Sequence, residues 1–380
     1  MLDRILSPPS QSFFLLGPRG SGKSTWLNAN FPDAHLIDLL SEETYHRLLA
    51  NPGQLADELR AIKEKKWVII DEIQRLPNLL NEVHRFIEKK HLRFALCGSS
   101  ARKLKRAGVN LLAGRALHRS MHPFVPEEIG NQFNLEEALS FGLLPIIWNS
   151  SEKSEVLSSY THLYLKEEVQ AEALVRNLQG FARFLPIAAL FHGQTVNVTN
   201  IARETGVTRT TVGGYLDILE ETLLCFRLPA YEAKLRARER KLPKLYWCDP
   251  GIVRAMKKST GSITPEEKGA LFEGLVAQLL RAYRDYRNLF DDFFYWSPVA
   301  KTETEVDFLL SRGKDFVAIE VKSGNTYSES WCKGLRAIAK LRNLKRRIIV
   351  YPRGPLLQSR DGIEIMPFEF FAGMLADGTL

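Results

Sequence analysis

Short apolar runs separated by longer polar stretches dominate the first third of the chain. Runs of this length, bounded by polar or turn residues, are typical of buried strands. They predict strands at residues 13–16, 34–40, 67–70, 93–97 and 116–121. The polar stretch at 42–65 has a helical pattern, and Asn51, Pro52 and Gly53 predict a turn within it.

The middle third of the chain has helical periodicity over most of its length. Apolar positions predict helices at 160–174 and 181–191. Two shorter helices, at 198–207 and 208–216, are predicted to meet at a Gly-containing turn. Their common core is predicted to consist of Ile201, Ala202, Val207, Val212 and Leu216. Strands predicted at 223–228 and 244–248 add a wing, so that this segment has the pattern of a winged helix.

The last third combines one long helix with several strands. Leucines at helical spacing predict a helix at 266–286, and Glu273 lies about two turns into it. A strand is predicted at 293–296, and the strands at 304–310 and 316–319 are predicted to form a hairpin. Another strand is predicted at 348–351.

Composition narrows the class of protein. With 380 residues the chain is long enough for two or three domains, and 45% hydrophobic with 25% charged residues is typical of a globular protein. No early stretch resembles a signal peptide, and no apolar run reaches the roughly 18 residues of a membrane span, so we expect a cytoplasmic protein without membrane contact. Four scattered cysteines indicate neither a disulfide framework nor a zinc site.

The first chemical motif follows the first predicted strand. Residues 17–24 read GPRGSGKS, which fits the phosphate-binding loop pattern G-x-x-x-x-G-K-[ST]. Glycines let successive N–H groups face phosphate oxygens, while a lysine adds positive charge and a serine hydroxyl binds Mg²⁺. The alternative is a chance Gly-rich turn. The predicted nucleotide-binding residues are Gly17, Pro18, Arg19, Gly20, Ser21, Gly22, Lys23, Ser24 and Thr25, with Ser24 also a Mg²⁺ ligand.

Acidic and polar residues at later strand ends complete this site. Asp71 and Glu72 end the third predicted strand, where we expect Asp71 to hold Mg²⁺ and Glu72 to polarise the attacking water. Ser99 or Ser100 is a candidate γ-phosphate sensor if its strand lies between the first and third, although either serine could instead cap a helix. Arg115 is a candidate finger acting on a neighbouring subunit, or else a plain exposed arginine.

These segments carry a family resemblance. The loop GPRGSGKS, the segments WVIIDEIQRLP, CGSSARKL and LLAGRALHRSMHPF, and the element Phe141 to Pro145 resemble a bacterial and archaeal group of AAA-type ATPases whose C-terminal domain of unknown function has a restriction-endonuclease-like fold. The resemblance implies a parallel sheet in a three-layer α/β sandwich. It also implies ATP and Mg²⁺ as cofactors, and hydrolysis between subunits of a homo-oligomer, with a hexamer as one possible ring size.

A net charge of +8 and a pI near 9.2 are compatible with an anionic partner. In the predicted winged helix, Arg209, Thr210, Thr211 and Gly213 face outward, and a basic loop joins the wing strands: Lys234, Arg236, Arg238, Arg240 and Lys241. A second basic cluster precedes the last predicted strand: Lys340, Arg342, Lys345, Arg346 and Arg347. Such segments can bind the DNA backbone, in duplex, branched or single-stranded form, or they are solvated surface.

The predicted hairpin carries a second motif. Asp307 lies on its first strand, and Glu320 and Lys322 lie two apart on the next, so both of these point to the same face. By resemblance this is the acid-(D/E)-x-K pattern of restriction-endonuclease-like folds, in which Asp307 and Glu320 hold a metal and Lys322 orients water, with Glu273 as an additional acid. The alternative is an internal ion pair.

The sequence thus predicts three α/β or helical domains: an AAA-type phosphate-loop ATPase domain at 1–148, a helical lid with a winged helix at 149–258, and a restriction-endonuclease-like domain at 259–380. Our leading hypothesis is a Mg²⁺-dependent oligomeric ATPase that acts on DNA. An ATP-gated metal-dependent nuclease and a protein-interaction switch without DNA binding are the alternatives.

Overall fold

A computed structural model describes residues 2–63, 65–100, 112, 114–163, 177–232, 242–259, 261–298 and 304–380. The chain divides into two compact units. The first comprises Asp3–Pro123 with Ile218–Leu224, and the second comprises Phe124–Asp217 with Cys225–Leu380. The three-domain division stays a prediction.

The first unit is built on a five-stranded parallel sheet with the order β2-β3-β4-β1-β5. Each strand lies on a segment that the sequence predicted as a strand: β1 (Phe13–Leu16), β2 (His35–Asp38), β3 (Trp67–Asp71), β4 (Arg93–Gly98) and β5 (Leu117–Ser120). The expected parallel sheet is confirmed, and β4 lies between β1 and β3. The carboxyl ends of these three strands therefore meet at one edge of the sheet.

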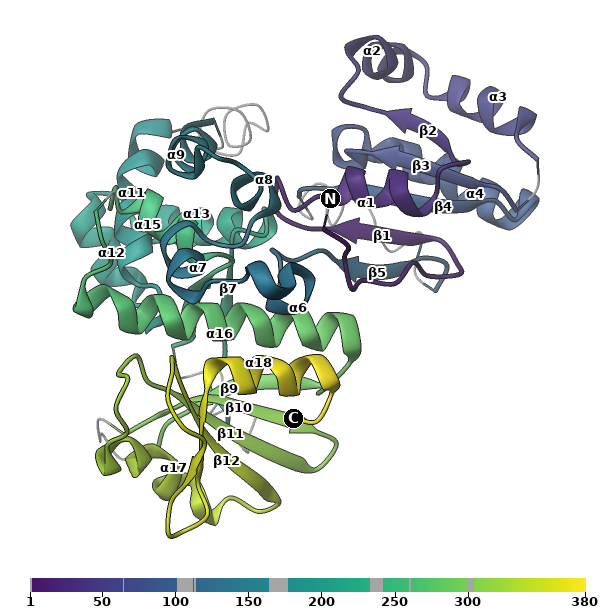
Figure 1. Ribbon diagram of the computed structural model, residues 1–380. Coiled ribbons are helices and arrows are strands. Elements are labelled where there is room, and N and C mark those ends of the chain that lie inside the picture. Colours follow the sequence, from purple (N-terminus) through teal and green to yellow (C-terminus); the bar gives the residue numbers. More distant parts are fainter. Residues whose placement is uncertain are drawn as a thin grey trace. The chain divides into compact units, whose positions relative to one another are not determined.

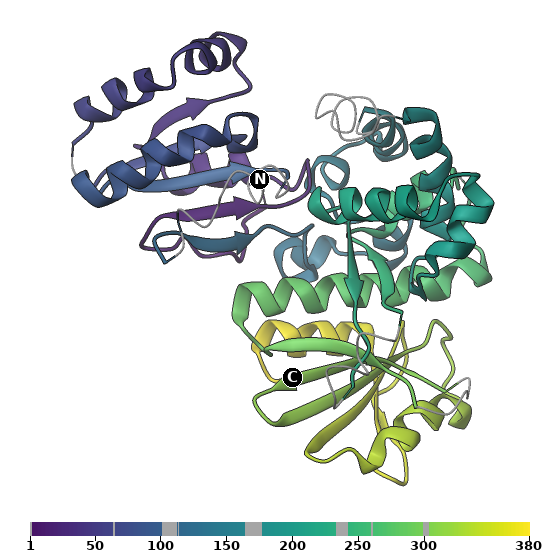
Figure 2. The same ribbon diagram turned by 180° about the vertical axis from the view of Figure 1, so that it is seen from behind.

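Helices cover both faces of this sheet (Figures 1 and 2). On one face lies α1 (Lys23–Asn30), where the Phe13 ring packs at centroid distances of 6.2 Å from Trp26 and 5.7 Å from Trp67. On the other face Phe14 belongs to a core with residues of α2 (Glu42–Ala50), α3 (Gly53–Ala61) and α4 (Leu80–Lys90). Successive residues of β1 thus point to opposite faces, which explains why the whole run is apolar.

Short 3₁₀ turns and small irregular helices link these elements. The first unit has η1 (Ile73–Arg75) and η2 (Pro77–Leu79) between β3 and α4. The turn predicted within 42–65 is present, since α2 ends at Ala50 and Asn51 Oδ1 accepts a 3.1 Å hydrogen bond from the Gly53 N–H at the start of α3.

The second unit begins with a largely helical part. Its helical segments are α6 (Pro126–Ile129), η4 (Gly130–Gln132), α7 (Leu135–Phe141), α8 (Pro145–Trp148), α9 (Lys153–Leu163), α11 (Leu178–Leu190), α12 (Val198–Thr205), α13 (Arg209–Glu221) and α15 (Pro250–Met256). The helix predicted at 181–191 is present as α11. Most of the helix predicted at 160–174 lies outside the described residues.

A buried aspartate joins two distant parts of this helical region. Asp249 caps α15 and accepts hydrogen bonds from the N–H groups of Gly251, at 2.8 Å, and of Leu143, at 2.6 Å. Gly142 has a φ of 80°, and a Cβ there would lie 1.7 Å from Asp249 Oδ1. The Gly-Leu element after α7 therefore requires glycine for both conformation and space.

The helix pair predicted at 198–216 is formed by α12 and α13. Asn197 caps α12, accepting a 3.0 Å hydrogen bond from the Thr199 N–H, and Gly206 ends it with a φ of 69°. An antiparallel sheet with the order β6-β8-β7 is formed by strands that flank the helix pair in the sequence: β6 (Gln194–Thr195), β7 (Cys225–Leu228) and β8 (Lys244–Trp247). The two wing strands therefore exist as predicted, and a third strand joins them.

The C-terminal part of the second unit contains a six-stranded mixed sheet with the order β13-β14-β12-β11-β10-β9. The strands are β9 (Asp292–Trp296), β10 (Val306–Arg312), β11 (Asp315–Val321), β12 (Leu344–Tyr351), β13 (Leu357–Gln358) and β14 (Glu364–Pro367). The predicted hairpin is confirmed, since β10 and β11 are antiparallel and joined by a tight turn at Gly313, which has a φ of 59°.

Helices lie on both faces of this sheet (Figure 1). Along one face run α16 (Pro265–Arg287), which matches the predicted long helix, and α18 (Phe368–Asp377), and their Phe272 and Phe368 rings are 5.7 Å apart. On the other face, η6 (Glu329–Cys332), α17 (Lys333–Ala337) and η7 (Ile338–Lys340) supply Cys332, Leu335 and Ile338 to a core with β10, β11 and β12.

Two further features concern the cysteines and the apolar helices. All four cysteines are buried as free thiols, as expected for small apolar residues. Among the described residues, no helix is long and apolar enough to cross a membrane.

Candidate functional site

The phosphate-loop motif connects β1 to α1 at the edge where the central strands end. Gly20 and Gly22 have φ angles of 76° and 88°, which are accessible to glycine without strain. A Cβ on Gly17 would lie 2.3 Å from the Met121 carbonyl oxygen, so this position has no room for a side chain. The backbone path of the loop therefore requires glycine at these positions.

The loop's lysine is buried and turned toward the loop. Lys23 Nζ donates hydrogen bonds of 2.8 Å to the Gly17 carbonyl and 3.1 Å to the Pro18 carbonyl. Ser21 is also buried, and its Oγ has no hydrogen-bond partner among the described residues. Arg19, Ser24 and Thr25 are exposed. A cation and an unsatisfied hydroxyl at the N-terminus of a helix fit the phosphates of a nucleotide.

Asp71 ends β3 next to the start of α1. Its Oδ2 accepts a 2.6 Å hydrogen bond from Ser24 Oγ, and its Oδ1 accepts a 3.0 Å bond from the Glu72 N–H. A hydroxyl and a carboxylate oxygen at contact distance are hard donors of the kind Mg²⁺ prefers. Ser24 and Asp71, predicted as ligands from segments far apart in the sequence, are brought together, and they fit this ion.

Glu72 has an unusual backbone conformation. Its φ of 55° and ψ of 43° lie in the left-handed region, which costs a non-glycine residue on the order of 1–3 kcal/mol. Glu72 Oε2 accepts hydrogen bonds from Ser99 Oγ, at 3.3 Å, and from Gln74 Nε2. The predicted water-polarising acid and the predicted sensor therefore touch each other, with the carboxylate held by neutral donors.

Gln74 is a site residue that sequence reasoning missed. Its side chain is 2% exposed, and its Nε2 also donates a 3.2 Å hydrogen bond to Ser99 Oγ. A Cβ on Gly98 would lie 2.3 Å from Gln74 Oε1, so β4 ends in a glycine where this amide approaches the backbone. The available signal was a glutamine two residues after the acidic pair, in a segment that otherwise buries apolar side chains.

Arg115 lies on the surface just before β5. Its guanidinium contacts Glu88 on α4, and this hydrogen bond and charge lower the pKa of the Glu88 carboxyl. The position is compatible both with a finger that reaches a neighbouring subunit and with a surface ion pair, so its catalytic role stays a prediction.

The C-terminal motif residues are also brought together. Glu273 from α16, Asp307 from β10, and Glu320 and Lys322 at the end of β11 line one cavity of about 340 Å³. Lys322 Nζ lies 2.6 Å from Glu320 Oε1, and Asp307 Oδ2 accepts a 2.8 Å hydrogen bond from the Val321 N–H. Burial, followed by the charge of Asp307, raises the pKa of Glu320.

A residue that the sequence did not indicate occupies the centre of this cluster. Lys244, the first residue of β8, is 2% exposed, and its Nζ lies 3.1 Å from Glu273 Oε1 and 2.9 Å from Glu305 Oε1. Asp307 Oδ1 is 3.5 Å away. Burial opposes the charged form, but the surrounding acids outweigh it and raise the pKa of Lys244. A lysine opening an otherwise apolar strand was the only local signal.

The proposed metal site is therefore already rich in protein cations. Within the described ranges, no group of three or more His, Cys, Asp or Glu side chains is arranged to hold a metal ion. Asp307 and Glu320, which the resemblance implied as metal ligands, instead contact Lys244 and Lys322, respectively. This donor set does not fit a divalent metal.

Two of the four predicted DNA-binding residues of α13 are exposed, whereas Thr211 and Gly213 are half-buried. Arg209 and Thr210 are exposed, and Thr208 Oγ1 accepts a 3.2 Å hydrogen bond from the Thr211 N–H, as expected of a helix cap. Of the predicted core, Ile201, Val212 and Leu216 are buried, and Ala202 and Val207 are half-buried. The basic loop residues Lys234, Arg236, Arg238, Arg240 and Lys241 lie outside the described residues.

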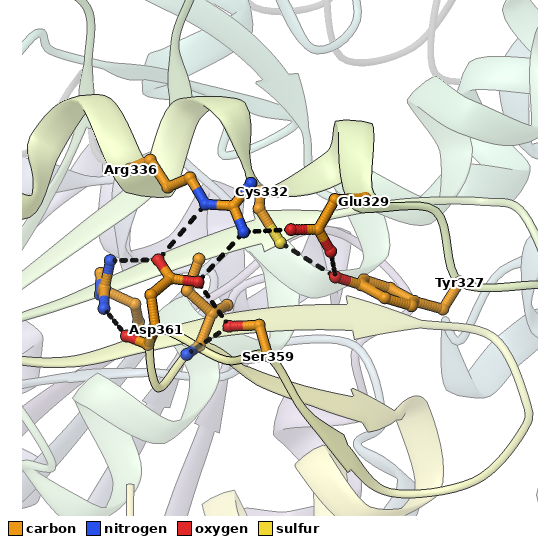
Figure 3. A network of polar contacts seen from close by, with 8 residues as sticks. Tyr327, Glu329, Cys332, Arg336, Ser359 and Asp361 are labelled. Atoms are coloured by element: carbon orange, nitrogen blue, oxygen red, sulfur yellow. Dashed lines mark hydrogen bonds and ion pairs between the residues drawn. The ribbon is translucent and has the colours of Figure 1, made fainter.

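Nearby acids form ion pairs with much of the second basic cluster. Arg346 forms a double hydrogen bond of 2.8 and 2.7 Å with Glu364, and Lys345 lies 3.5 Å from Asp315. Arg347 lies 3.2 Å from Asp361. Figure 3 shows that Asp361 is also held by Arg336 and by Ser359, whose Oγ donates at 2.9 Å.

Figure 3 also shows how Arg336 joins this network to η6: it contacts Glu329, to which Tyr327 donates a 2.5 Å hydrogen bond. Since three of the five basic residues have carboxylate partners, this surface offers less positive charge than its sequence indicates.

The first unit's parallel sheet and loop geometry define a phosphate-loop nucleotide-binding domain. Residues 9–130 match the family model described as "AAA domain", so the chain carries an AAA-type ATPase domain. Residues 268–371 match "Domain of unknown function (DUF4143)", and residues 132–262 match "Domain of unknown function (DUF8612)". The protein is therefore an AAA-type ATPase with a C-terminal domain of unknown function, as the resemblance implied.

Relatives and solved structures are distant. Uncharacterized proteins of Mycobacterium bovis and Mycobacterium tuberculosis are each 25% identical over 346 residues, which cover 89% of this chain and 76% of theirs. The Orc1 protein of Aeropyrum pernix, solved in complex with DNA, is 11% identical with a TM-score of 0.30, covering 67% of this chain and 87% of that one. A signal transduction ATPase of Pyrococcus horikoshii is 16% identical with a TM-score of 0.25, covering 72% and 43%.

Proposed function

We propose that this ATPase is Mg²⁺-dependent and oligomeric and that it binds DNA and acts on it with the free energy of ATP hydrolysis. The observation that carries the catalytic part is the arrangement at the ends of β3 and β4. There Asp71 meets Ser24 at 2.6 Å, and Glu72 meets Ser99 at 3.3 Å. Each pair combines residues from different segments at the edge where the phosphate loop begins.

In this mechanism Lys23 leaves the two carbonyls that it contacts and binds phosphate oxygens, which are stronger acceptors for its charge. Ser24 and Asp71 hold Mg²⁺, which neutralises charge on the phosphates when bound. Glu72 accepts a proton from the attacking water, and Ser99 reports on the γ phosphate through its hydrogen bond to Glu72. Arg115 of a neighbouring subunit supplies positive charge to the transition state.

Two features of α13 support a DNA contact. Arg209 and Thr210 are exposed at its start, as in helices that enter a DNA groove. Gly213 and Gly214 follow in the helix, and a Cβ on either would meet no described atom within 4 Å. Glycine costs a helix roughly 0.5–1 kcal/mol, and packing within the described chain does not require glycine at these two positions. Close approach of a partner's backbone would account for the two glycines.

The catalytic and the DNA-binding halves are tested together by ATP turnover. We expect steady-state hydrolysis to depend on Mg²⁺, to disappear in Lys23→Ala, and to rise when duplex, single-stranded or branched DNA is added. Affinity measured by fluorescence anisotropy should fall with salt and should fall further in Arg209→Ala, whereas Arg60→Ala in the first unit is the matched control. Absence of stimulation and of salt-dependent binding for every DNA form would refute the DNA half alone.

The oligomer is tested by complementation between inactive variants. Arg115→Ala keeps an intact phosphate loop, and Lys23→Ala keeps an intact Arg115. If Arg115 acts across a subunit boundary, mixing the two variants restores part of the ATP turnover. Glu88→Gln removes the charge that Arg115 contacts on α4 and should stay active. An active Arg115→Ala protein, or a mixture without rescue, would contradict action in trans.

A further inference from the structure

The C-terminal acidic cluster is organised around a lysine that comes from another sheet. Lys244 belongs to β8 of the three-stranded sheet, whereas Glu273 lies on α16 and Asp307 lies on β10 of the six-stranded sheet. We propose that Lys244 is a built-in cation that takes the place of a divalent metal in this cluster. The cluster then ties β8 to the C-terminal sheet and does not cut nucleic acid.

The positions of the oxygen atoms carry this proposal. Glu273 Oε1 accepts from Lys244 at 3.1 Å and from the Tyr246 hydroxyl, and Asp307 Oδ1 lies 3.5 Å from the same ammonium. Asp307 Oδ2 is occupied by the Val321 N–H, and Glu320 Oε1 by Lys322. Glu320 Oε2 is buried and has no hydrogen-bond partner within the described residues. Divalent cations such as Mg²⁺ are held by several oxygens at about 2.0–2.6 Å, whereas one oxygen of each of these three acids already faces an ammonium group.

The ammonium is held in place by its strand. β8 is the central strand of its sheet, and all four of its residues are buried. Lys244 Nζ also lies 5.8 Å from the ring centroid of Tyr295, whose hydroxyl donates a 2.7 Å hydrogen bond to the Leu242 carbonyl. Because Lys244 is buried on this central strand, its ammonium group is not placed to face solvent. If the Lys244 ammonium moved away from the acids, the ammonium and the carboxylates would each be buried without a compensating charge, which is strongly unfavourable.

The charges around the cavity agree with this role. Glu273, Glu305, Asp307 and Glu320 provide four acids, and Lys244 and Lys322 provide two ammonium groups in direct contact with them. Lys333 also lines the cavity. A divalent cation entering this space would meet the repulsion of both ammonium groups at close range, whereas the acids already have positive partners.

The experiment measures Mn²⁺ binding to the full chain by isothermal titration calorimetry without nucleotide. All variants carry Asp71→Asn, so that the ATPase site contributes no metal binding. With Lys244 intact, we expect no heat from a C-terminal site and no change on Asp307→Asn. Replacing the lysine by Lys244→Met should create one Mn²⁺ site per chain, with at least a tenfold gain in affinity, and adding Asp307→Asn should remove it. Circular dichroism reports whether each variant is folded.

Each outcome bears on the proposal. Stoichiometric Mn²⁺ binding with Lys244 intact, lost on Asp307→Asn or Glu320→Gln, would overturn it. A folded Lys244→Met protein that binds no Mn²⁺ would also overturn the proposal, because the Lys244 ammonium would then not occupy the position of a metal ion. If Lys244→Met does not fold, the comparison of Asp71→Asn with Asp71→Asn/Asp307→Asn decides, and Lys244→Arg, which keeps the charge, should fold and stay metal-free. ATP turnover is not a readout here, so this test fails or succeeds independently of the proposed function.

Discussion

Two buried lysines distinguish the two candidate sites of this chain. Within the described part of the chain, Lys23 in the phosphate loop donates hydrogen bonds to the carbonyl oxygens of Gly17 and Pro18, at 2.8 and 3.1 Å. Lys244 in the C-terminal cluster lies within 3.5 Å of three carboxylates. A neutral carbonyl gives up an ammonium to a phosphate readily, whereas a buried carboxylate does not, because both charges would lose their partner.

The acids of the two sites differ in the same way. Asp71 and Glu72 accept hydrogen bonds from a serine hydroxyl, a backbone N–H and an amide, all neutral donors. Asp307, Glu273 and Glu320 each contact an ammonium group. Both sites match a catalytic motif in residue order, but the acids of the phosphate-loop site contact neutral donors, whereas those of the C-terminal cluster contact ammonium groups. Whether a motif can work depends on what already neutralises it.

The largest expected effect comes from Glu72. In Glu72→Gln the amide cannot accept a proton from water, so we expect kcat for ATP to fall by about 10²–10⁴-fold. Nucleotide affinity, measured with a fluorescent ATP analogue, should stay unchanged, because Lys23, Ser24 and the loop are intact. Glu82→Gln on α4 is the control and should keep full turnover. A Glu72→Gln enzyme within about twofold of the native rate would remove Glu72 from the mechanism.

Two matched substitutions test the comparison of Lys23 with Lys244 directly. Lys244→Met leaves buried carboxylates unpaired, and we expect it to lower the free energy of unfolding by about 3–5 kcal/mol. Lys23→Met loses only hydrogen bonds to two carbonyls and should cost about 1 kcal/mol. Urea denaturation of the full chain at neutral pH measures both. Equal costs for the two variants would show that the surroundings of the two ammonium groups do not differ as described.

The pH dependence of stability should report on Glu320. Burial and then the charge of Asp307 raise its pKa above the ordinary value of 4.5. The folded state therefore holds this proton more tightly than the unfolded state. The resulting stabilisation is complete below about pH 4.5 and is lost as the pH rises. We expect the free energy of unfolding, measured by urea denaturation across the pH range, to decline less in Glu320→Gln than in the native protein. The difference should be roughly 1–3 kcal/mol between about pH 5 and 8.

Asp361 serves as a control of opposite sign. Its hydrogen bond with Arg336 lowers the pKa of the Asp361 carboxyl below 3.8. Its contribution is therefore present above that pH and is lost on acidification, so Asp361→Asn should remove a part of the acid sensitivity. A profile for Glu320→Gln that parallels the native one would mean that Glu320 is ionised in the folded protein.

The smallest expected effect separates stability from binding on α13. Gly213→Ala should raise the free energy of unfolding by about 0.5–1 kcal/mol, because alanine favours the helix, and should weaken DNA binding because a methyl group now faces the partner. Gly373→Ala in α18 is matched, since a Cβ there also meets no described atom within 4 Å. It should stabilise equally and leave DNA affinity unchanged. Undiminished affinity in Gly213→Ala would place the DNA contact elsewhere.

Local patterns in the sequence were sufficient for the strands of the first unit, the phosphate loop, the long helix α16 and the β10–β11 hairpin. Each has a periodicity, a turn residue or a motif within a few residues, and local backbone preference and burial act over that range. The short strands β13 and β14 and the helix α18 were not predicted, because they bury residues against a sheet assembled from distant segments.

Two residues most change the interpretation of the sites, and only the tertiary structure shows their place in them. Gln74 meets Ser99 across 25 residues, and Lys244 meets Glu273 across 29 and Asp307 across 63. The sequence determined that a loop could cradle phosphate and that acids and a lysine share a hairpin. Only the fold decided which of these charges have a buried partner, because electrostatic pairing depends on distance in space and leaves no periodic trace along the chain.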